Sequence, residues 1–178
     1  MAELLSEKWI RGVAVTTTCL AVMTAIAAAR GAACGAKTQL LTAVESSKWA
    51  YYQAKSIKQN LAETQKNAFE IERLGAVNSD QRALYDQKLD AAIHDISRYG
   101  TEKDGIRKEA EETAALNGRL AKKGNLFSAA VVFFQIAIML SSVSALLKKR
   151  FMWVVGLVFG VIATALLGYG LWLAPLLF

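Results

Sequence analysis

The side chains that could do chemistry in this chain are few and widely separated. Its only histidine, His94, has no cysteine or second histidine at the spacing of a metal site. Glu109, Glu111 and Glu112 are carboxylates of the kind that act in general acid–base catalysis. On a charged helix they are instead expected to be solvated, with Lys108 and Glu112 paired one turn apart. No phosphate-binding glycine loop, nucleophile elbow or zinc-protease helix occurs, so we expect no enzyme activity, cofactor or metal.

The charge distribution weighs against a nucleic acid as partner. The net charge is +6, but residues 37–123 carry 15 basic and 13 acidic side chains, which is near balance. The basic excess lies beside apolar tracts, where membrane topology explains it. Cys19 and Cys34 are too few for a disulfide framework, and they do not identify a redox compartment.

Two long apolar tracts dominate the C-terminal third of the chain. Apolar residues make up 54% of the sequence, and its mean hydropathy is +0.28. Residues 124–147 are 24 positions without a charge, and residues 151–178 are 28 such positions. Because a membrane-spanning helix needs about 20 apolar residues, we predict two spans, at 124–147 and 151–174, joined as a helical hairpin.

A third apolar tract covers residues 12–29, between Arg11 and Arg30. It is rich in alanine and includes four threonines, so its signal is weaker than those of the other two tracts. We predict an uncleaved first transmembrane helix within residues 1–36. The alternatives are a signal peptide, because basic residues precede the tract, and a lipoprotein site at Cys34.

Residues 37–123 are predicted to form a long antiparallel coiled-coil hairpin with its turn near 75–80. On each side of the turn, mostly apolar or small residues recur at alternating intervals of three and four, which is a heptad pattern. The predicted seam of the first arm is Leu40, Ala43, Ser47, Ala50, Ala54, Ile57, Leu61, Thr64, Ala68 and Ile71. The predicted seam of the second arm is Tyr85, Leu89, Ala92, Ile96, Tyr99, Lys103, Ile106, Ala110, Thr113, Asn117 and Leu120. A carboxylate in place of Ala54 is therefore expected to disrupt the hairpin.

Local signals place the turn and a weak point in the second arm. Gly75 can end the first arm in the left-handed conformation, and Ser79 or Asp80 can cap the second arm. Gly100 and Gly105 weaken the second arm, so we expect a kink or break there. The polar seam residues of that arm indicate register control or a third contact rather than a dry core.

The segment Trp49-Ala-Tyr-Tyr-Gln-Ala-Lys-Ser-Ile-Lys58 places three aromatic rings on the first arm. They flank the seam position Ala50, so at least one ring must point away from a two-helix interface. The segment lies too far beyond the first span to be a headgroup belt. The rings either broaden the hairpin's own apolar face or form a protein–protein contact, for which we expect self-association. The candidate interaction residues are Trp49, Tyr51, Tyr52, Gln53, Lys55 and Lys58.

The same segment resembles the signature of an uncharacterised bacterial membrane-protein family, one of the domains of unknown function. Members of that family share an N-terminal span, a predicted coiled coil that opens with this signature, and a C-terminal pair of spans. The later stretch Phe134-Gln-Ile-Ala-Ile-Met-Leu-Ser-Ser142 fits the family as well, so the resemblance covers nearly the whole chain. It implies this architecture, and it brings no activity, substrate or cofactor.

Polar and small residues form one stripe on each of the two C-terminal spans. Ser128, Gln135 and Ser142 are seven residues apart, and a mid-membrane glutamine is costly unless it faces protein or water. That stripe forms either an interhelical hydrogen bond that fixes packing or a polar line along a pore in an oligomer. The third span has a small residue at every fourth position, which permits close contact with the second span or with another subunit. These residues are Gly156, Gly160, Thr164 and Gly168.

The basic residues 148–150 form nearly the whole connection between the last two spans. Three positive charges in so short a loop favour the cytoplasmic side, which places the N-terminus inside and the hairpin outside. Basic residues at the base of the hairpin oppose this orientation, but the charge bias loses force over segments longer than about 60 residues. We therefore expect a multi-pass protein of the bacterial inner membrane with a periplasmic or extracellular hairpin.

These patterns predict an all-α membrane protein with three transmembrane helices and a long coiled-coil hairpin. We expect a non-enzymatic homo-oligomer that acts as a scaffold or interaction protein through its stalk. Its expected partners are the lipid bilayer, other copies of the chain and, as an alternative, another protein bound by the stalk. The alternative function is an ion channel or transport component whose passage is lined by the Gln135 stripe.

Overall fold

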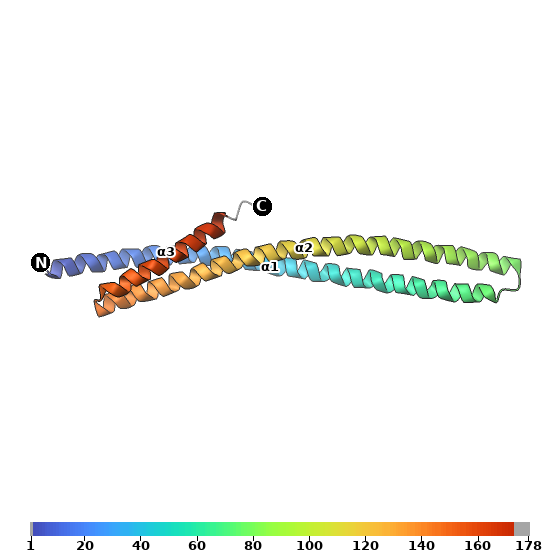
Figure 1. Ribbon diagram of the computed structural model, residues 1–178, viewed down its shortest axis with the longest axis horizontal. Coiled ribbons are helices and arrows are strands. Elements are labelled where there is room, and N and C mark those ends of the chain that lie inside the picture. The colour runs from blue at the N-terminus through green and yellow to red at the C-terminus, as the bar shows by residue number, and fades with distance from the viewer. Residues whose placement is uncertain (1, 173–178) are drawn as a thin grey trace. The chain divides into compact units, whose positions relative to one another are not determined.

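The computed structural model describes residues 2–172 of the chain, and the side chains of residues 9–172. Three helices make up this part, and no strand occurs in it, which confirms the prediction of an all-α protein. The helices are α1 (Ala2–Leu74), α2 (Ser79–Leu147) and α3 (Arg150–Trp172) (Figure 1). The predicted end of the third span, residues 173–174, lies outside the described residues.

Each of the three helices is long and apolar enough to cross a membrane, which indicates a membrane protein. The chain forms two compact units. The apolar unit consists of residues 2–39 and 118–172, so it contains all three apolar tracts. The hairpin unit consists of residues 40–117, which carry most of the charges.

The two arms of the hairpin unit run side by side and are joined by residues 75–78 (Figure 1). Gly75 and Ala76 each donate a backbone N–H to the carbonyl oxygen three residues earlier, at 3.2 Å. The Arg82 side chain donates to the Ala76 carbonyl oxygen at 3.1 Å, and the Ala76 side chain is buried. No glycine in the described part of the chain has a positive φ, so the left-handed Gly75 cap is wrong. Instead, hydrogen bonds between residues three positions apart satisfy the last carbonyl oxygens of α1.

The second arm follows its predicted heptad pattern. Every predicted seam residue on α2 is buried or half-buried, and Ala110 is fully buried. The expected break at Gly100 and Gly105 is wrong, because α2 continues as one helix through both positions. A glycine costs a helix only about 1 kcal/mol relative to alanine, and packing along a long helix outweighs that cost.

The first arm presents the opposite face to its partner. All ten predicted seam residues of α1 are exposed, with Leu40 at 65%, Ile57 at 68% and Ile71 at 71%. A second series of α1 residues in the hairpin unit is buried or half-buried instead, with Trp49 and Ser56 half-buried beside it: Leu41, Glu45, Lys48, Tyr52, Lys55, Gln59, Ala62, Lys66 and Phe69. This second series also repeats every three and four residues. Four of its members, Lys48, Tyr52, Lys55 and Gln59, contact α2, so the predicted first-arm seam is wrong. The expectation that a carboxylate at Ala54 disrupts the hairpin is wrong for the same reason, because Ala54 is exposed.

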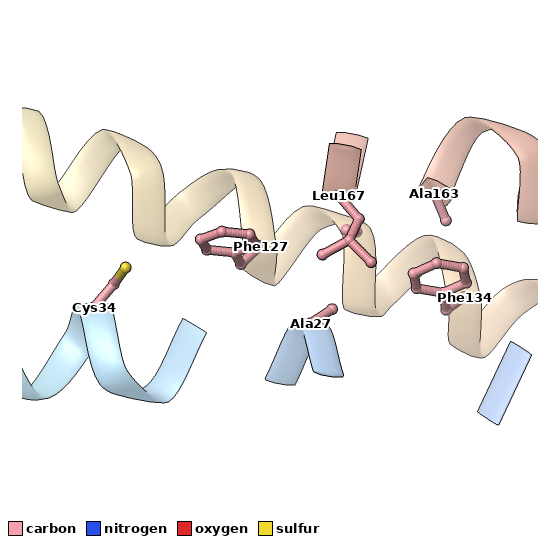
Figure 2. Packing of buried hydrophobic residues seen from close by; sticks show 7 residues of the cluster. Ala27, Cys34, Phe127, Phe134, Ala163 and Leu167 are labelled. Carbon is pink, nitrogen blue, oxygen red and sulfur yellow. The ribbon is translucent and has the colours of Figure 1, made fainter. Parts of the chain in front are cut away.

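The apolar unit is held together by a core to which all three helices contribute. The largest buried side chains of this core are the rings of Phe127 and Phe134, one heptad apart on α2. They pack against small residues of the other two helices, which brings the helix backbones close together. The labelled members of the core are Ala27, Cys34, Phe127, Phe134, Ala163 and Leu167 (Figure 2).

The threonines of the first apolar tract satisfy their own hydroxyl groups within α1. Thr17 and Thr24 each donate to a backbone carbonyl oxygen four residues earlier, at 2.7 Å. Thr16 and Thr18 do the same, at 3.0 and 2.9 Å. Because each hydroxyl proton has an acceptor inside the helix, this threonine-rich tract suits an apolar surrounding.

A tight turn joins α2 to α3. The Ser144 hydroxyl donates to the Lys149 carbonyl oxygen at 2.9 Å, and the Lys149 N–H donates to the Ser144 carbonyl oxygen at 3.2 Å. Lys148 between them has a φ of 53°, in the left-handed region that non-glycine residues rarely adopt. These bonds to a buried serine therefore hold the basic loop in one conformation.

Candidate functional site

The aromatic signature of residues 49–58 lies on α1 in the hairpin unit, and its Lys55 reaches the second arm. The Lys55 ammonium forms an ion pair with the Glu102 carboxylate. The two side chains are 14% and 39% exposed, so water only partly screens the pair. The same ammonium lies 5.3 Å from the ring centroid of Tyr51 and 5.4 Å from that of Tyr99. Lys55 is thus held by an ion pair and by two cation–π contacts that come from both arms.

The other aromatic rings of the signature pack near this pair. Trp49 and Tyr52 meet edge to face, with ring centroids 5.7 Å apart. The Lys103 ammonium, from the second arm, lies 5.7 Å from the Tyr52 centroid and donates to Gln59 Oε1 at 2.9 Å. Trp49 and Tyr52 are half-buried, whereas Tyr51 is 54% exposed, which makes Tyr51 the least covered of the three rings. The residues that meet between the arms here, which we call the cross-arm cluster, are Tyr52, Lys55, Gln59, Tyr99, Glu102 and Lys103.

Further polar contacts join the arms outside the cross-arm cluster. Lys48 Nζ lies 3.3 Å from a carboxylate oxygen of Glu109 and donates to Thr113 Oγ1 at 3.1 Å. Asn117 Nδ2 donates to Thr42 Oγ1 at 2.9 Å. Because these contacts connect defined pairs of residues, sliding one arm along the other would break all of them at once. The cross-arm contacts of Lys103 and Asn117 are what register control, one of the two roles expected of these polar seam positions, requires.

The charges of the cross-arm cluster stabilise one another. The hydrogen bond from Lys55 holds the pKa of Glu102 below its ordinary value of 4.5, and the charges of Arg98 and Lys58 act in the same direction. The same hydrogen bond raises the pKa of Lys55 above its ordinary value of 10.5. Both groups therefore stay charged near neutral pH. Such a pair is suited to holding two helices together and unsuited to transferring a proton at that pH.

The residues that could have served catalysis lie apart or in ordinary surface pairs. The His94 side chain is 77% exposed, and its Nδ1 lies 4.0 Å from the carboxylate of Asp95. Glu111 pairs with Arg107 on its own helix at 2.8 Å, while Glu109 is engaged by the first arm. Within the described residues, no group of three or more histidine, cysteine or acidic side chains is arranged to hold a metal ion.

The exposed apolar face of α1 is the second feature of the hairpin unit. We call the ten exposed residues of the predicted first-arm seam, from Leu40 to Ile71, the outer stripe. Three signature residues, Tyr51, Gln53 and Lys58, are exposed beside this stripe. The signature therefore serves two faces of α1, since its Tyr52 and Lys55 contact the second arm.

The small residues of α3 divide into two pairs. Gly156 and Gly160 are buried, and they pack against the other two helices of the apolar unit. A Cβ built on Gly156 would lie 3.0 Å from the Ala137 carbonyl oxygen, and one on Gly160 would lie 2.9 Å from a methyl of Leu20. Gly156 and Gly160 therefore allow close helix contact within one chain, which is one of the two uses predicted for these glycines.

Thr164 and Gly168 continue the same stripe but are exposed. The Thr164 hydroxyl donates to the Gly160 carbonyl oxygen at 2.8 Å, and a Cβ on Gly168 would meet nothing within 4 Å. Sequence reasoning missed Gly170, which is buried against the ring of Phe127. Its position two residues after Gly168 breaks the four-residue spacing, so no periodic signal marks it.

The polar stripe of the second span lies on the outside of α2 in the apolar unit. Ser128, Gln135 and Ser142 are all exposed, whereas Phe127 and Phe134 beside them are buried. The Ser142 hydroxyl donates to the carbonyl oxygen four residues earlier at 2.9 Å. The Gln135 side chain is thus exposed on the outer side of α2 in the described part of the apolar unit.

Comparison with known proteins places the chain in a family. No curated protein and no solved structure matches it. The sequence pattern of a family described as a domain of unknown function, DUF4337, matches residues 9–173, which is nearly the whole chain. The expected membership of an uncharacterised family is thereby confirmed, and the chain belongs to the DUF4337 family.

Proposed function

We propose that this protein is a non-enzymatic, homo-oligomeric membrane scaffold whose coiled-coil stalk is an interaction surface. The observation that supports this function is the inverted use of α1 in the hairpin unit. Lysine and tyrosine side chains of α1 pack between the arms, while Leu40, Ile57 and Ile71 are left exposed. Contiguous exposed apolar surface on a protein in water marks a site of association.

We further propose that the apolar unit anchors the protein in a bacterial inner membrane. Lys148, Lys149 and Arg150 are all exposed in the turn between α2 and α3, where they can meet the cytoplasmic face. This orientation places the N-terminus in the cytoplasm and the hairpin unit in the periplasm or outside the cell. The stalk is then positioned to contact other copies or another protein.

The number of subunits in mild detergent tests this function. We expect the full-length protein to be larger than a monomer by light scattering coupled to size exclusion, over a tenfold range of protein concentration. A constant monomer mass over that range would contradict the proposal. A catalytic turnover of any substrate that depends on the cross-arm cluster would also contradict it.

A second candidate function is a channel or transport component, favoured by the outward position of Gln135. In an oligomer, a stripe of Ser128, Gln135 and Ser142 from each copy could line a passage. We expect Gln135→Leu to abolish conductance of reconstituted protein if this function is correct, and to leave the oligomer intact if the protein is a scaffold. Absence of ion flux under voltage or tension would exclude the channel.

A further inference from the structure

The outer stripe of α1 has the pattern of a helix-pairing seam, and nothing in the described part of the chain covers it. Its ten residues recur at alternating intervals of three and four from Leu40 to Ile71, without interruption. None of the ten is charged, and all are exposed. A stripe with this period winds slowly around a straight helix, so another supercoiled helix covers it better than a flat surface does.

The outer face of the other arm differs sharply. On α2 the exposed positions include Asp90, Asp104, Lys108 and Glu112, which water solvates well. The large apolar side chains exposed on α2 in the hairpin unit, Leu84, Ile93 and Leu116, do not recur at a heptad spacing, so they form no second apolar stripe. This contrast makes α1, and not α2, the surface that needs a cover.

Two rows of residues flank the outer stripe, and they determine which helix can pack there. The row on one side is Gln39, Ser46, Gln53, Asn60 and Asn67. The row on the other side is Val44, Tyr51, Lys58, Gln65 and Glu72. Only two of these ten residues are charged, Lys58 and Glu72, and they have opposite signs. The flanks therefore offer little repulsion to an identical helix.

The orientation of an identical helix follows from chain connectivity. In every copy the first apolar tract precedes the stripe on α1, so two copies anchored in one membrane point the same way. In a parallel pair, each residue of the first row faces the residue five positions later on the partner helix. Lys58 then faces Gln53, and Glu72 faces Asn67, so no like charges meet. An amide can accept a hydrogen bond from an ammonium and donate one to a carboxylate.

We propose that a second copy of this chain covers the outer stripe, with the two α1 helices parallel and in register over residues 40–71. This inference rests on the proposed function and names the surface that it uses. Leu40, Ile57 and Leu61 each meet their own counterpart in the pair, and the alanines between them allow the two backbones to approach closely. Tyr51, the most exposed ring of the signature, lies at the edge of this interface.

Single-cysteine cross-linking of the full-length protein in mild detergent tests this inference. The background carries Cys19→Ser and Cys34→Ala, which remove both native thiols. In a parallel in-register pair a cysteine of the stripe faces its own copy, so we expect Ala50→Cys to form disulfide-linked dimers under mild oxidation. The matched control is Ala91→Cys, an exposed alanine on α2, which we expect to stay uncross-linked.

A second substitution tests the surface without relying on the first one alone. Ala54→Glu places a carboxylate on the outer stripe, where the chain alone has room for it, so helix content by circular dichroism should not change. In the Ala50→Cys background it should lower the cross-linked yield by about tenfold or more, since two facing carboxylates repel. Ala91→Glu in the same background should leave the yield unchanged.

The outcomes separate this inference from the proposed function. An oligomer whose stripe cysteines do not cross-link overturns the inference and leaves a homo-oligomeric scaffold standing. A monomer without cross-links overturns both. A stripe cysteine that links only to a different protein overturns the second copy as occupant. Equal cross-linking of Ala50→Cys and Ala91→Cys also overturns it, because the contact is then not specific to α1.

Discussion

The Lys55 ammonium on α1 forms an ion pair with the Glu102 carboxylate on α2, and it joins the two arms of the hairpin unit. Tyr51 and Tyr99 contribute their ring faces to the same lysine, so the pair sits between aromatic surfaces from both arms. This arrangement explains why Lys55, one of the two charged residues of the signature, points toward the second arm. The signature first holds the hairpin in register, and its remaining exposed residues then border the surface offered to a partner.

Removing the acid of this pair should loosen the hairpin locally. We expect Glu102→Gln to increase hydrogen exchange of backbone amides near residues 52–59 and 99–106 by about two- to fivefold, the range typical of partly exposed pairs. The measurement is hydrogen exchange with mass spectrometry on the full-length protein in detergent. Amides of the apolar unit should exchange at the unchanged rate.

A double-mutant cycle gives the control for this prediction. If the two residues act through one another, the combined effect of Lys55→Gln and Glu102→Gln should be smaller than the sum of the two single effects. Additive effects of the two substitutions would show that the pair does not couple the arms, and that the aromatic contacts of Lys55 act alone.

The same pair gives the hairpin a defined pH dependence. The pKa of Glu102 is lowered on folding, so its contribution to stability is complete above the ordinary pKa of 4.5 and is lost as pH falls through the folded value. The pKa of Lys55 is raised, so its contribution is complete below 10.5 and is lost as pH rises through the folded value. We expect the difference in melting temperature between wild type and Glu102→Gln to be constant between about pH 6 and 9 and to shrink below about pH 4. A difference that does not change at acidic pH would contradict this assignment.

Overpacking of the inter-arm core should destabilise the hairpin unit. Ala110 is fully buried, so we expect Ala110→Leu to lower the free energy of unfolding of the hairpin unit by about 1–3 kcal/mol. The exposed Ala91 provides the control, since Ala91→Leu should change it by less than about 0.5 kcal/mol. Amide exchange of residues 40–117 measures both effects. Equal effects at the two positions would mean that the arms do not pack through Ala110.

In the apolar unit, two glycines of α3 should respond oppositely to alanine. A Cβ on Gly156 would lie 3.0 Å from a backbone oxygen and 3.3 Å from the Cβ of Leu140, so we expect Gly156→Ala to cost about 1–3 kcal/mol. A Cβ on Gly168 would meet nothing within 4 Å, so Gly168→Ala should be neutral or stabilising by up to about 1 kcal/mol. Thermal unfolding followed by tryptophan fluorescence compares the two. A stabilising Gly156→Ala would show that α2 and α3 are not in close contact there.

The proposed orientation predicts from which side of the membrane the hairpin turn can be labelled. In the cysteine-free background, Ser79→Cys places one exposed thiol at the start of α2. We expect an impermeant thiol reagent to label it in intact bacterial cells whose outer membrane has been permeabilised. Labelling only after complete lysis would place the hairpin in the cytoplasm and reverse the proposed orientation.

Much of the architecture could be predicted because it depends on local composition and period. The charge-free tracts lie on helices that can cross a membrane, and the heptad pattern of the second arm gave the correct inward face down to Asn117. The break expected at Gly100 and Gly105 is absent, since glycine propensity is a weak local term beside packing along a whole helix. Among the described residues, a positive φ occurs at Lys148. Because this position is not a glycine, the sequence does not indicate the left-handed conformation there.

The sequence by itself determined that α1 has two faces of the same heptad period, one free of charged residues and one that carries three lysines. Only the tertiary structure decided which of them meets α2. Apolar content favoured the face with Leu40 and Ile57 as the one that packs on α2. However, Glu102 and Tyr99 lie on α2 at positions where they contact Lys55 of the other face. Period and hydrophobicity are properties of one helix, whereas an ion pair and its register are properties of two. For that reason the lysine-rich face pairs within the chain, and the apolar face remains exposed on the other side of α1.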